Sequence, residues 1–267
     1  MKLFKPKQLQ DSGIFMWLYG DSGVGKSTSV LQSSPQPMLY IMGERRNPKR
    51  FLHAAGLDES ADIDFTFYDT VGEFIEFLGN HKNLERYKSV VVDGVTHLMN
   101  VQLASEIAGE ALDARMADKN KKVDRPLIEG SKLSLEGYGS LSNLMFRIMT
   151  LLGKLSDEAG KVVVLISLLQ ENPRWNRDLE AGPCLAGKDF GKNMPGFPDL
   201  IGVVRRQFVL DEKTGEKVTV YPPNVSFEGD GFLCKWTGAP LKAKAGPLNV
   251  QKIVDLTKQS TNGGNAV

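Results

Sequence analysis

The sequence predicts an α/β fold with a mostly parallel central sheet, flanked by helices and extended toward its C-terminal side by antiparallel strands. Strand-like and helix-like segments alternate up to about residue 170, which is typical of a parallel sheet covered on both faces. Two strand-like segments are uninterrupted apolar runs, as expected of strands buried on both sides. After residue 200, strand-like segments follow one another without intervening helices, which indicates antiparallel pairing.

The individual elements follow from these patterns. Apolar runs predict strands at 14–19, 38–42, 64–68, 89–93 and 162–167. Apolar residues at helical spacing predict helices at about 26–33, 71–80, 95–115 and 137–158. Further strands are expected at 201–210, 217–222 and 232–236, where the turns between them contain glycine and charged residues.

The composition is that of an ordinary globular protein, with 41% hydrophobic and 24% charged residues. The 33 basic and 32 acidic side chains leave a formal net charge of +1, so any contact with nucleic acid must come from a local basic patch. No segment resembles a signal peptide or a membrane-spanning apolar run. We therefore expect a cytoplasmic protein that makes no membrane contact.

The segment GDSGVGKS at 20–27 matches the pattern G-x-x-x-x-G-K-[ST] at every fixed position, and it joins a predicted strand to a predicted helix as that pattern requires. In such a loop, backbone N–H groups and the positive end of the helix point at a phosphate. Lys26 would contact the β- and γ-phosphates, and the Ser27 hydroxyl would hold Mg²⁺. The predicted triphosphate site comprises Ser22, Gly23, Val24, Gly25, Lys26, Ser27 and Thr28.

Two acidic residues at the ends of predicted strands are candidates for the chemistry. Asp93 would complete the Mg²⁺ shell together with Ser27, directly or through water. Glu44 would orient the attacking water near the γ-phosphate, since phosphoryl transfer asks mainly for positioning. The alternative for Glu44 is a solvated carboxylate that forms surface pairs with Arg45 and Arg46.

A polar side chain after the last parallel strand would sense the γ-phosphate. Gln170 is the candidate, with Ser167 as its rival, and ordinary polarity at a strand end is the alternative to both. With Lys26 and Glu44, Gln170 would form the catalytic set. The Asn-Lys-x-Asp pattern of guanine recognition is missed by one residue at 120–124 and follows no strand, which favours ATP.

In this order of motifs the chain resembles the RecA/RadA core, and in detail the phage RecA-like ATPases of the Sak-type single-strand-annealing group. The resemblance spans residues 12–240. It rests on GDSGVGKST at 20–28, YIMGE at 40–44, VVVDGVTHL at 90–98, EGYGSL at 136–141 and GPCLAGKDFGKNMPGFPDLIGVVRR at 182–206.

The resemblance implies a Mg²⁺-dependent, ATP-hydrolysing protein that acts on single-stranded DNA in phage recombination, annealing or replication, in the cytoplasm of the bacterial host. Glu44 maps onto the catalytic glutamate and Asp93 onto the Walker B aspartate. Assembly into rings or filaments is also implied, with ATP between subunits and a neighbour's basic residue completing the site. Lys188 and Lys192 are the two candidates for it. A phage single-strand-binding protein would be a further partner.

The same resemblance implies single-stranded DNA along two long, aperiodic segments, 117–136 and 170–198, the second of which the γ-phosphate would reorder. Cations with an aromatic ring suit sequence-tolerant binding. The candidates are Lys119, Lys121, Lys122, Arg125, Arg174, Trp175 and Arg177. The alternatives are a solvated charged loop for the first segment and, for Trp175, packing against a neighbouring subunit.

Three parts are expected along the chain: a short basic arm at 1–12, a RecA-like ATPase domain at 13–243, and a partly disordered tail at 244–267. Two other functions stay open. A nucleotide or small-molecule kinase would need an arginine-rich lid and an acceptor pocket. An ATP-gated assembly scaffold or loader would bind ATP, with hydrolysis incidental.

Overall fold

The apolar runs of the sequence form one sheet in the computed structural model, which describes residues 13–118, 125, 130–211, 214–237 and 245–262. Its strands lie in the order β10–β8–β7–β1–β5–β4–β2–β3. Their bounds are β1 Ile14–Gly20, β2 Met38–Met42, β3 Ile63–Thr66, β4 Ser89–Asp93, β5 Val162–Glu171, β7 Leu200–Leu210, β8 Lys217–Ser226 and β10 Ala245–Pro247. Two short strands pair at the ends, β6 (Ala181–Pro183) with β5 and β9 (Lys235–Trp236) with β7.

The strands from β7 to β3 run parallel to their neighbours, whereas β8 and β10 continue the sheet antiparallel beyond β7. This arrangement confirms the predicted fold class. The strand β5 lies between β1 and β4. Consequently the loop after β1 and the acidic end of β4 stand at the same edge of the sheet, one strand apart.

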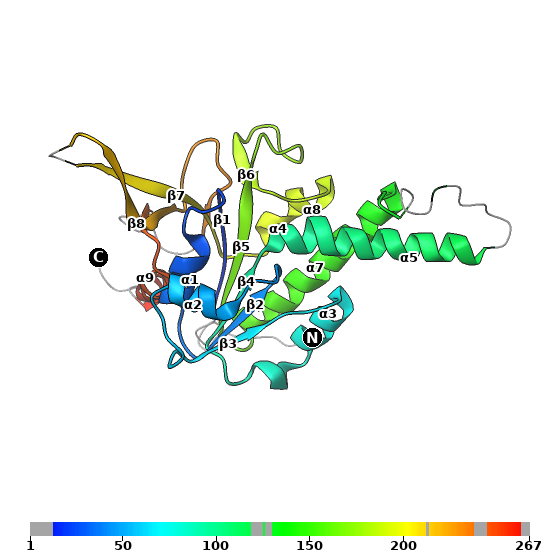
Figure 1. Ribbon diagram of the computed structural model, residues 1–267, viewed down its shortest axis with the longest axis horizontal. Helices are drawn as coiled ribbons and strands as arrows, with labels where there is room; N and C mark the ends of the chain where they lie inside the picture. Colours follow the sequence, from blue (N-terminus) through cyan, green and yellow to red (C-terminus); the bar gives the residue numbers. More distant parts are fainter. Residues whose placement is uncertain (1–12, 119–124, 126–129, 212–213, 238–244, 263–267) are drawn as a thin grey trace.

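Helices cover both faces of the sheet (Figure 1). One face carries α1 (Lys26–Ser33), α2 (Pro48–Ala54) and α9 (Val250–Asn262), and the other carries α3 (Val71–Gly79), α4 (Val95–His97), α7 (Leu135–Asp157) and α8 (Lys188–Asn193). Alternate side chains of β1 enter one apolar cluster and the remainder enter the other, which is why every residue of this strand is buried. A π-helical turn at Leu98–Leu103 leads into α5 (Ala104–Ala117), which projects from the body beside the start of α7 (Figure 1).

The C-terminal part of the chain differs from the predicted tail. The strand β10 joins the sheet next to β8, and α9 packs on α1. Leu248, Val250 and Val254 are at most 2% exposed, so this part is integral to the core. The expected basic arm at 1–12 and residues 263–267 lie outside the described residues.

Residues 170–198 also hold more structure than the aperiodic sequence indicates. They contain the end of β5, the strand β6, the helix α8 and a 3₁₀ turn at Met194–Gly196. A segment expected to be one long loop is therefore built from short elements that pack against β5 and α7.

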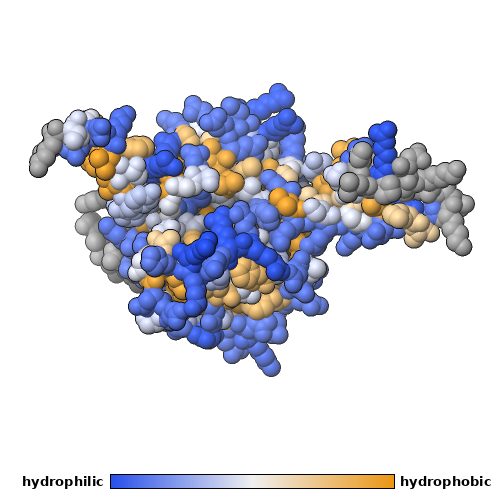
Figure 2. All heavy atoms as spheres, viewed as in Figure 1, coloured by the Kyte–Doolittle hydropathy of each residue, from blue (hydrophilic) through white to orange (hydrophobic). Residues whose placement is uncertain are grey.

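The hairpin of β7 and β8 projects from the body (Figure 1), and apolar side chains are exposed on it (Figure 2). They are Phe208, Val209, Leu210, Val218 and Tyr221. None of the helices in the described part of the chain combines the length and apolarity that a membrane crossing requires.

Candidate nucleotide-binding site

The loop between β1 and α1 has the backbone form that curls around a phosphate. Gly23 has φ 70° and Gly25 has φ 97°, in the left-handed region that glycine enters without steric cost. A Cβ on Gly20 would lie 2.3 Å from the carbonyl oxygen of Val204, so only glycine lets the loop leave the sheet this close to β7. The first turn of α1 begins at Lys26, and its backbone N–H groups form the positive end of that helix.

Lys26 is held inside this loop. Its Nζ donates to the carbonyl oxygens of Gly20 and Asp21, each at 2.7 Å, and the residue is only 6% exposed. Burial lowers the pKa of Lys26 to about 8, while the carboxylates of Asp93 and Asp21 oppose that shift and Arg46 adds to it. The buried ammonium of Lys26 is destabilised by the loss of water, so an anionic ligand bound in the loop would stabilise it.

The end of β4 places Asp93 opposite the start of α1. The Tyr40 hydroxyl donates to Oδ2 of Asp93 at 2.8 Å, and the Ser27 hydroxyl interacts with both groups. Burial raises the pKa of Asp93, and the hydrogen bonds from Tyr40 and Ser27 together with the charges of Arg46 and Lys26 oppose that rise. A hydroxyl and a carboxylate that face each other are oxygen ligands of the kind that Mg²⁺ prefers.

The two oxygen ligands, from Ser27 and Asp93, suit a magnesium ion better than a metal whose ligands all come from protein side chains. Within the described ranges, no three His, Cys, Asp or Glu side chains are grouped as metal ligands. Mg²⁺ commonly takes one or two protein oxygens and completes its shell with waters and substrate phosphates. Ser27 and Asp93 are the residues that would hold it here.

Glu44 lies at the same edge, one strand beyond Asp93. The backbone N–H of Gly43 donates to the carbonyl oxygen of Asp93 at 2.8 Å, which fixes the chain just before Glu44. One carboxylate oxygen of Glu44 accepts hydrogen bonds from Nε of Arg46, at 3.2 Å, and from its Nη2. The expected surface pairing thus exists with Arg46, whereas Arg45 pairs with Asp69.

A cleft of about 440 Å³ runs over the phosphate loop and α1. Beyond the loop residues, its lining includes Arg46, Phe51 and Tyr221. The Tyr221 ring approaches within 3.1 Å of where a Cβ on Gly25 would lie. We did not predict a role for Tyr221, because nothing local in the sequence shows that β8 returns to the phosphate loop.

A sequence model of an AAA domain family matches residues 12–228. The chain belongs to this family of P-loop NTPases. The matched range of the AAA domain includes the phosphate loop, Glu44, Asp93 and the whole projecting hairpin, and it ends before β9, β10 and α9. A search of curated proteins found no match to the chain.

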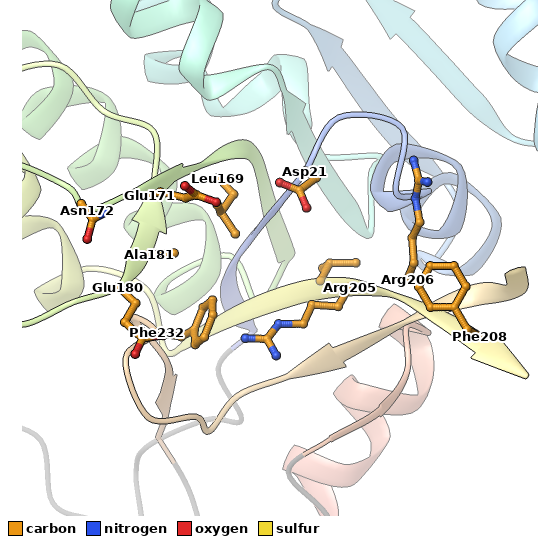
Figure 3. A pocket seen from close by; sticks show the side chains of 11 residues that line it. Asp21, Leu169, Glu171, Asn172, Glu180, Ala181, Arg205, Arg206, Phe208 and Phe232 are labelled. Carbon is orange, nitrogen blue, oxygen red and sulfur yellow. The ribbon is translucent and has the colours of Figure 1, made fainter. Parts of the chain in front are cut away.

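Beside the phosphate loop, the AAA domain has a second cleft of about 850 Å³ between β5, β6 and β7 (Figure 3). Asp21, Glu171 and Glu180 line it together with Arg205 and Arg206, which belong to β7. The Arg205 guanidinium lies 3.9 Å from the centroid of the Phe232 ring. Arg206 points toward the phosphate loop instead, with Nη2 3.7 Å from a Cβ built on Gly23, a placement that sequence reasoning missed.

The two candidate sensors of the γ-phosphate differ in their surroundings. Ser167 is 2% exposed and its Oγ accepts a hydrogen bond from Trp17 Nε1 at 2.8 Å, so its hydroxyl belongs to the core. Gln170 lies on the extension of β5, paired with Gly182 of β6. Its Oε1 is buried without a hydrogen-bond partner among the described residues.

Lys188 and Lys192 lie one turn apart on α8, and both are exposed. This helix packs against α7, on the face of the sheet opposite α1. Neither lysine lines the cleft over the phosphate loop. Their placement leaves them free to meet another molecule.

Trp175 does not have the exposure that base stacking requires, which corrects that part of the expected DNA interface. It is 4% exposed and is wedged between the backbones of Gly182 and Gly191, since a Cβ on Gly191 would lie 2.4 Å from its Cγ. The ring is buried in its own chain, so packing against a neighbouring subunit does not describe it either. Arg174 and Arg177 beside it are exposed.

The remaining candidates for DNA contact do not form a basic patch among the described residues. Lys119, Lys121 and Lys122 lie outside the described residues, and Arg125 is exposed. In the stretch 171–180, three carboxylates accompany Arg174 and Arg177. That stretch alone is therefore not a basic patch of the kind that attracts a phosphate backbone.

Proposed function

We propose that the chain is a Mg²⁺-dependent ATPase. The observation that carries the proposal is the meeting of Ser27 and Asp93 beside a phosphate loop that already holds a buried lysine. Membership of the P-loop NTPase family supports nucleotide binding. ATP is favoured over GTP because the guanine-recognition pattern is incomplete at 120–124.

In this function Lys26 exchanges its two carbonyl partners for phosphate oxygens. Ser27 and Asp93 would hold a Mg²⁺ ion, which would supply positive charge to neutralise the phosphates. Glu44 accepts a hydrogen bond from the attacking water and thereby aligns it with the γ-phosphate. Gln170 reports the state of that phosphate to β6, with which it is paired.

The test compares ATP binding and hydrolysis in the wild type and two variants, with Mg²⁺ present or chelated. Lys26→Ala removes the phosphate-binding cation and should abolish binding. Glu44→Gln should bind ATP at least as tightly as the wild type but hydrolyse it at least about 100-fold more slowly, because the carboxylate that positions the water is lost. Full hydrolysis by Glu44→Gln would contradict the assigned role, and phosphorylation of an added small acceptor would favour the kinase alternative.

We further propose that the protein is RecA-like, of the Sak type, self-associates with ATP between subunits, and uses ATP on single-stranded DNA. The motif resemblance supports this, and Arg174 and Arg177, which are exposed beyond the strand that carries Gln170, are among the described cations that would contact the DNA. Lys188 or Lys192 would complete a neighbour's site. Substituting the lysine that does so should lower hydrolysis without weakening nucleotide binding, and substituting the other should change neither.

The DNA proposal is tested by hydrolysis with and without single-stranded DNA and by DNA binding at several salt concentrations. Arg174→Ala with Arg177→Ala should reduce stimulation and binding, while Arg147→Ala, an exposed arginine on α7, serves as the matched control. Absence of stimulation and of salt-dependent binding would overturn this part and leave the ATPase proposal standing. An ATP-gated scaffold predicts assembly that survives Glu44→Gln.

A further inference from the structure

Arg46 joins two parts of the site, the carboxylate of Glu44 and the cleft over the phosphate loop. Its guanidinium donates two hydrogen bonds to one oxygen of Glu44, through Nε at 3.2 Å and through Nη2. The same side chain lines the cleft over the phosphate loop. One group therefore holds the candidate water-positioning carboxylate and faces the space that phosphates would occupy.

The charge of Arg46 also reaches the other functional groups. It helps to lower the pKa of Lys26, and it stabilises the ionised form of Asp93. These effects on the pKa values of Lys26 and Asp93 indicate that the Arg46 guanidinium lies close to both side chains, where the phosphate loop joins α1. The terminal phosphate of a triphosphate would lie at that end.

The pair of Glu44 and Arg46 is suited to exchange partners. The two side chains are 40% and 52% exposed, and a solvated ion pair of this kind contributes little stability. A guanidinium binds phosphate oxygens through two parallel N–H donors, with charge on both partners. A γ-phosphate in the cleft is thus a stronger partner for Arg46 than Glu44 is.

We propose that Arg46 senses the γ-phosphate and releases Glu44 when a triphosphate binds. With the site empty or holding a diphosphate, Arg46 occupies the carboxylate oxygen of Glu44 that a water would otherwise use. With a triphosphate bound, Arg46 turns to the terminal phosphate and Glu44 becomes free to accept from water. The proposal rests on the nucleotide site proposed above and assigns Arg46 as a positioning residue for it.

The first measurement is binding of ADP and of a non-hydrolysable ATP analogue, both with Mg²⁺, by titration calorimetry. Arg46→Ala should weaken binding of the analogue about tenfold or more and change ADP binding by no more than about twofold. The matched control is Arg45→Ala, because Arg45 is the neighbouring arginine and pairs with Asp69. It should leave both affinities unchanged.

The second measurement separates competition from a merely structural role. Glu44→Gln frees Arg46 and should strengthen binding of the ATP analogue by about two- to fivefold. That gain should vanish when Arg46→Ala is added, because it depends on Arg46. A gain that persists in the double variant reports direct repulsion by Glu44 and overturns the proposal.

Equal weakening of ADP and of the analogue by Arg46→Ala would place Arg46 at another phosphate and overturn the sensing role. No weakening of either would show that Arg46 makes no phosphate contact. A wild-type protein that binds neither nucleotide would instead count against the nucleotide site itself, so the two failures are distinguishable.

Discussion

Single residues in the site carry charges that their own surroundings oppose. Burial favours the neutral form of Lys26 and the protonated form of Asp93. The charge of Asp93 opposes the effect of burial on the pKa of Lys26, and the charge of Lys26 opposes the effect of burial on the pKa of Asp93. Neither group has a solvated environment of its own. A triphosphate with a divalent cation would satisfy both, since the phosphates pair with the lysine and the cation with the carboxylate. The opposed charges thus prepare the site for that combined ligand.

Nucleotide affinity should therefore depend on the pH in a range where ATP itself no longer titrates. The pKa of Lys26 in the ligand-free protein is about 8, so Lys26 is mostly protonated at pH 7 and mostly neutral at pH 9. Because the phosphates require the protonated form, affinity should fall as the pH rises through 8, approaching about tenfold per unit above the pKa.

Dissociation constants measured between pH 7 and pH 9.5 check this expectation. Lys26→Arg is the control, since arginine stays charged throughout that range, and whatever affinity it retains should not change with pH. A wild-type affinity that is flat up to pH 9.5 would show that Lys26 keeps an ordinary pKa.

At the scale of elements, local sequence patterns predicted the strands and helices that build the phosphate loop. The strands β1, β4 and β5 are apolar runs, and such a run predicts a buried strand from the local sequence alone. The placement of Asp93 and Glu44 at one edge also followed, because the carboxyl ends of parallel strands meet there.

The elements that sequence reasoning missed depend on contacts between distant residues. The helix α9 begins where the backbone N–H of Val250 donates to Ser33 Oγ. The strand β8 brings Tyr221 over Gly25, and Trp175 is buried only because two glycines leave room for it. No pattern within a short window of sequence records such contacts.

The core role of the C-terminal part can be tested with Leu248→Ala. Leu248 is 1% exposed, and its backbone N–H donates to the carbonyl oxygen of Pro223. Removing its buried side chain should lower the free energy of unfolding by about 2–5 kcal/mol, measured by urea denaturation. Asn249→Ala, at an exposed neighbour, should cost less. A chain ending at residue 244 with wild-type stability would contradict this core role.

At the scale of the whole molecule, the projecting hairpin of β7 and β8 exposes apolar side chains that a monomer would leave in contact with water. Val209 pairs with Val218 across the hairpin, and they are 56% and 48% exposed. An isolated two-stranded hairpin has marginal stability in water, and clustered exposed apolar side chains commonly mark an interaction surface. Self-association through this hairpin would remove that surface from water.

Val209→Asp should therefore weaken self-association while leaving the fold intact, because it adds a charge to a surface that a second copy would cover. Sedimentation velocity with and without ATP measures the assembly, and Lys217→Ala, at an exposed polar position on β8, is the control. A wild-type protein that stays monomeric at every concentration, with ATP present, would contradict the expected rings or filaments.

The wedge formed by Trp175 has an optical consequence. Its indole is 4% exposed, and its Nε1 has no hydrogen-bond partner among the described residues. Because the emission of an indole shifts to longer wavelength when water reaches it, Trp175 is a fluorophore placed inside the segment that follows Gln170. If ATP binding opens that segment and lets water reach the indole, the emission of Trp175 should shift to longer wavelength. If the segment moves as a rigid unit around Trp175, its emission wavelength will not change.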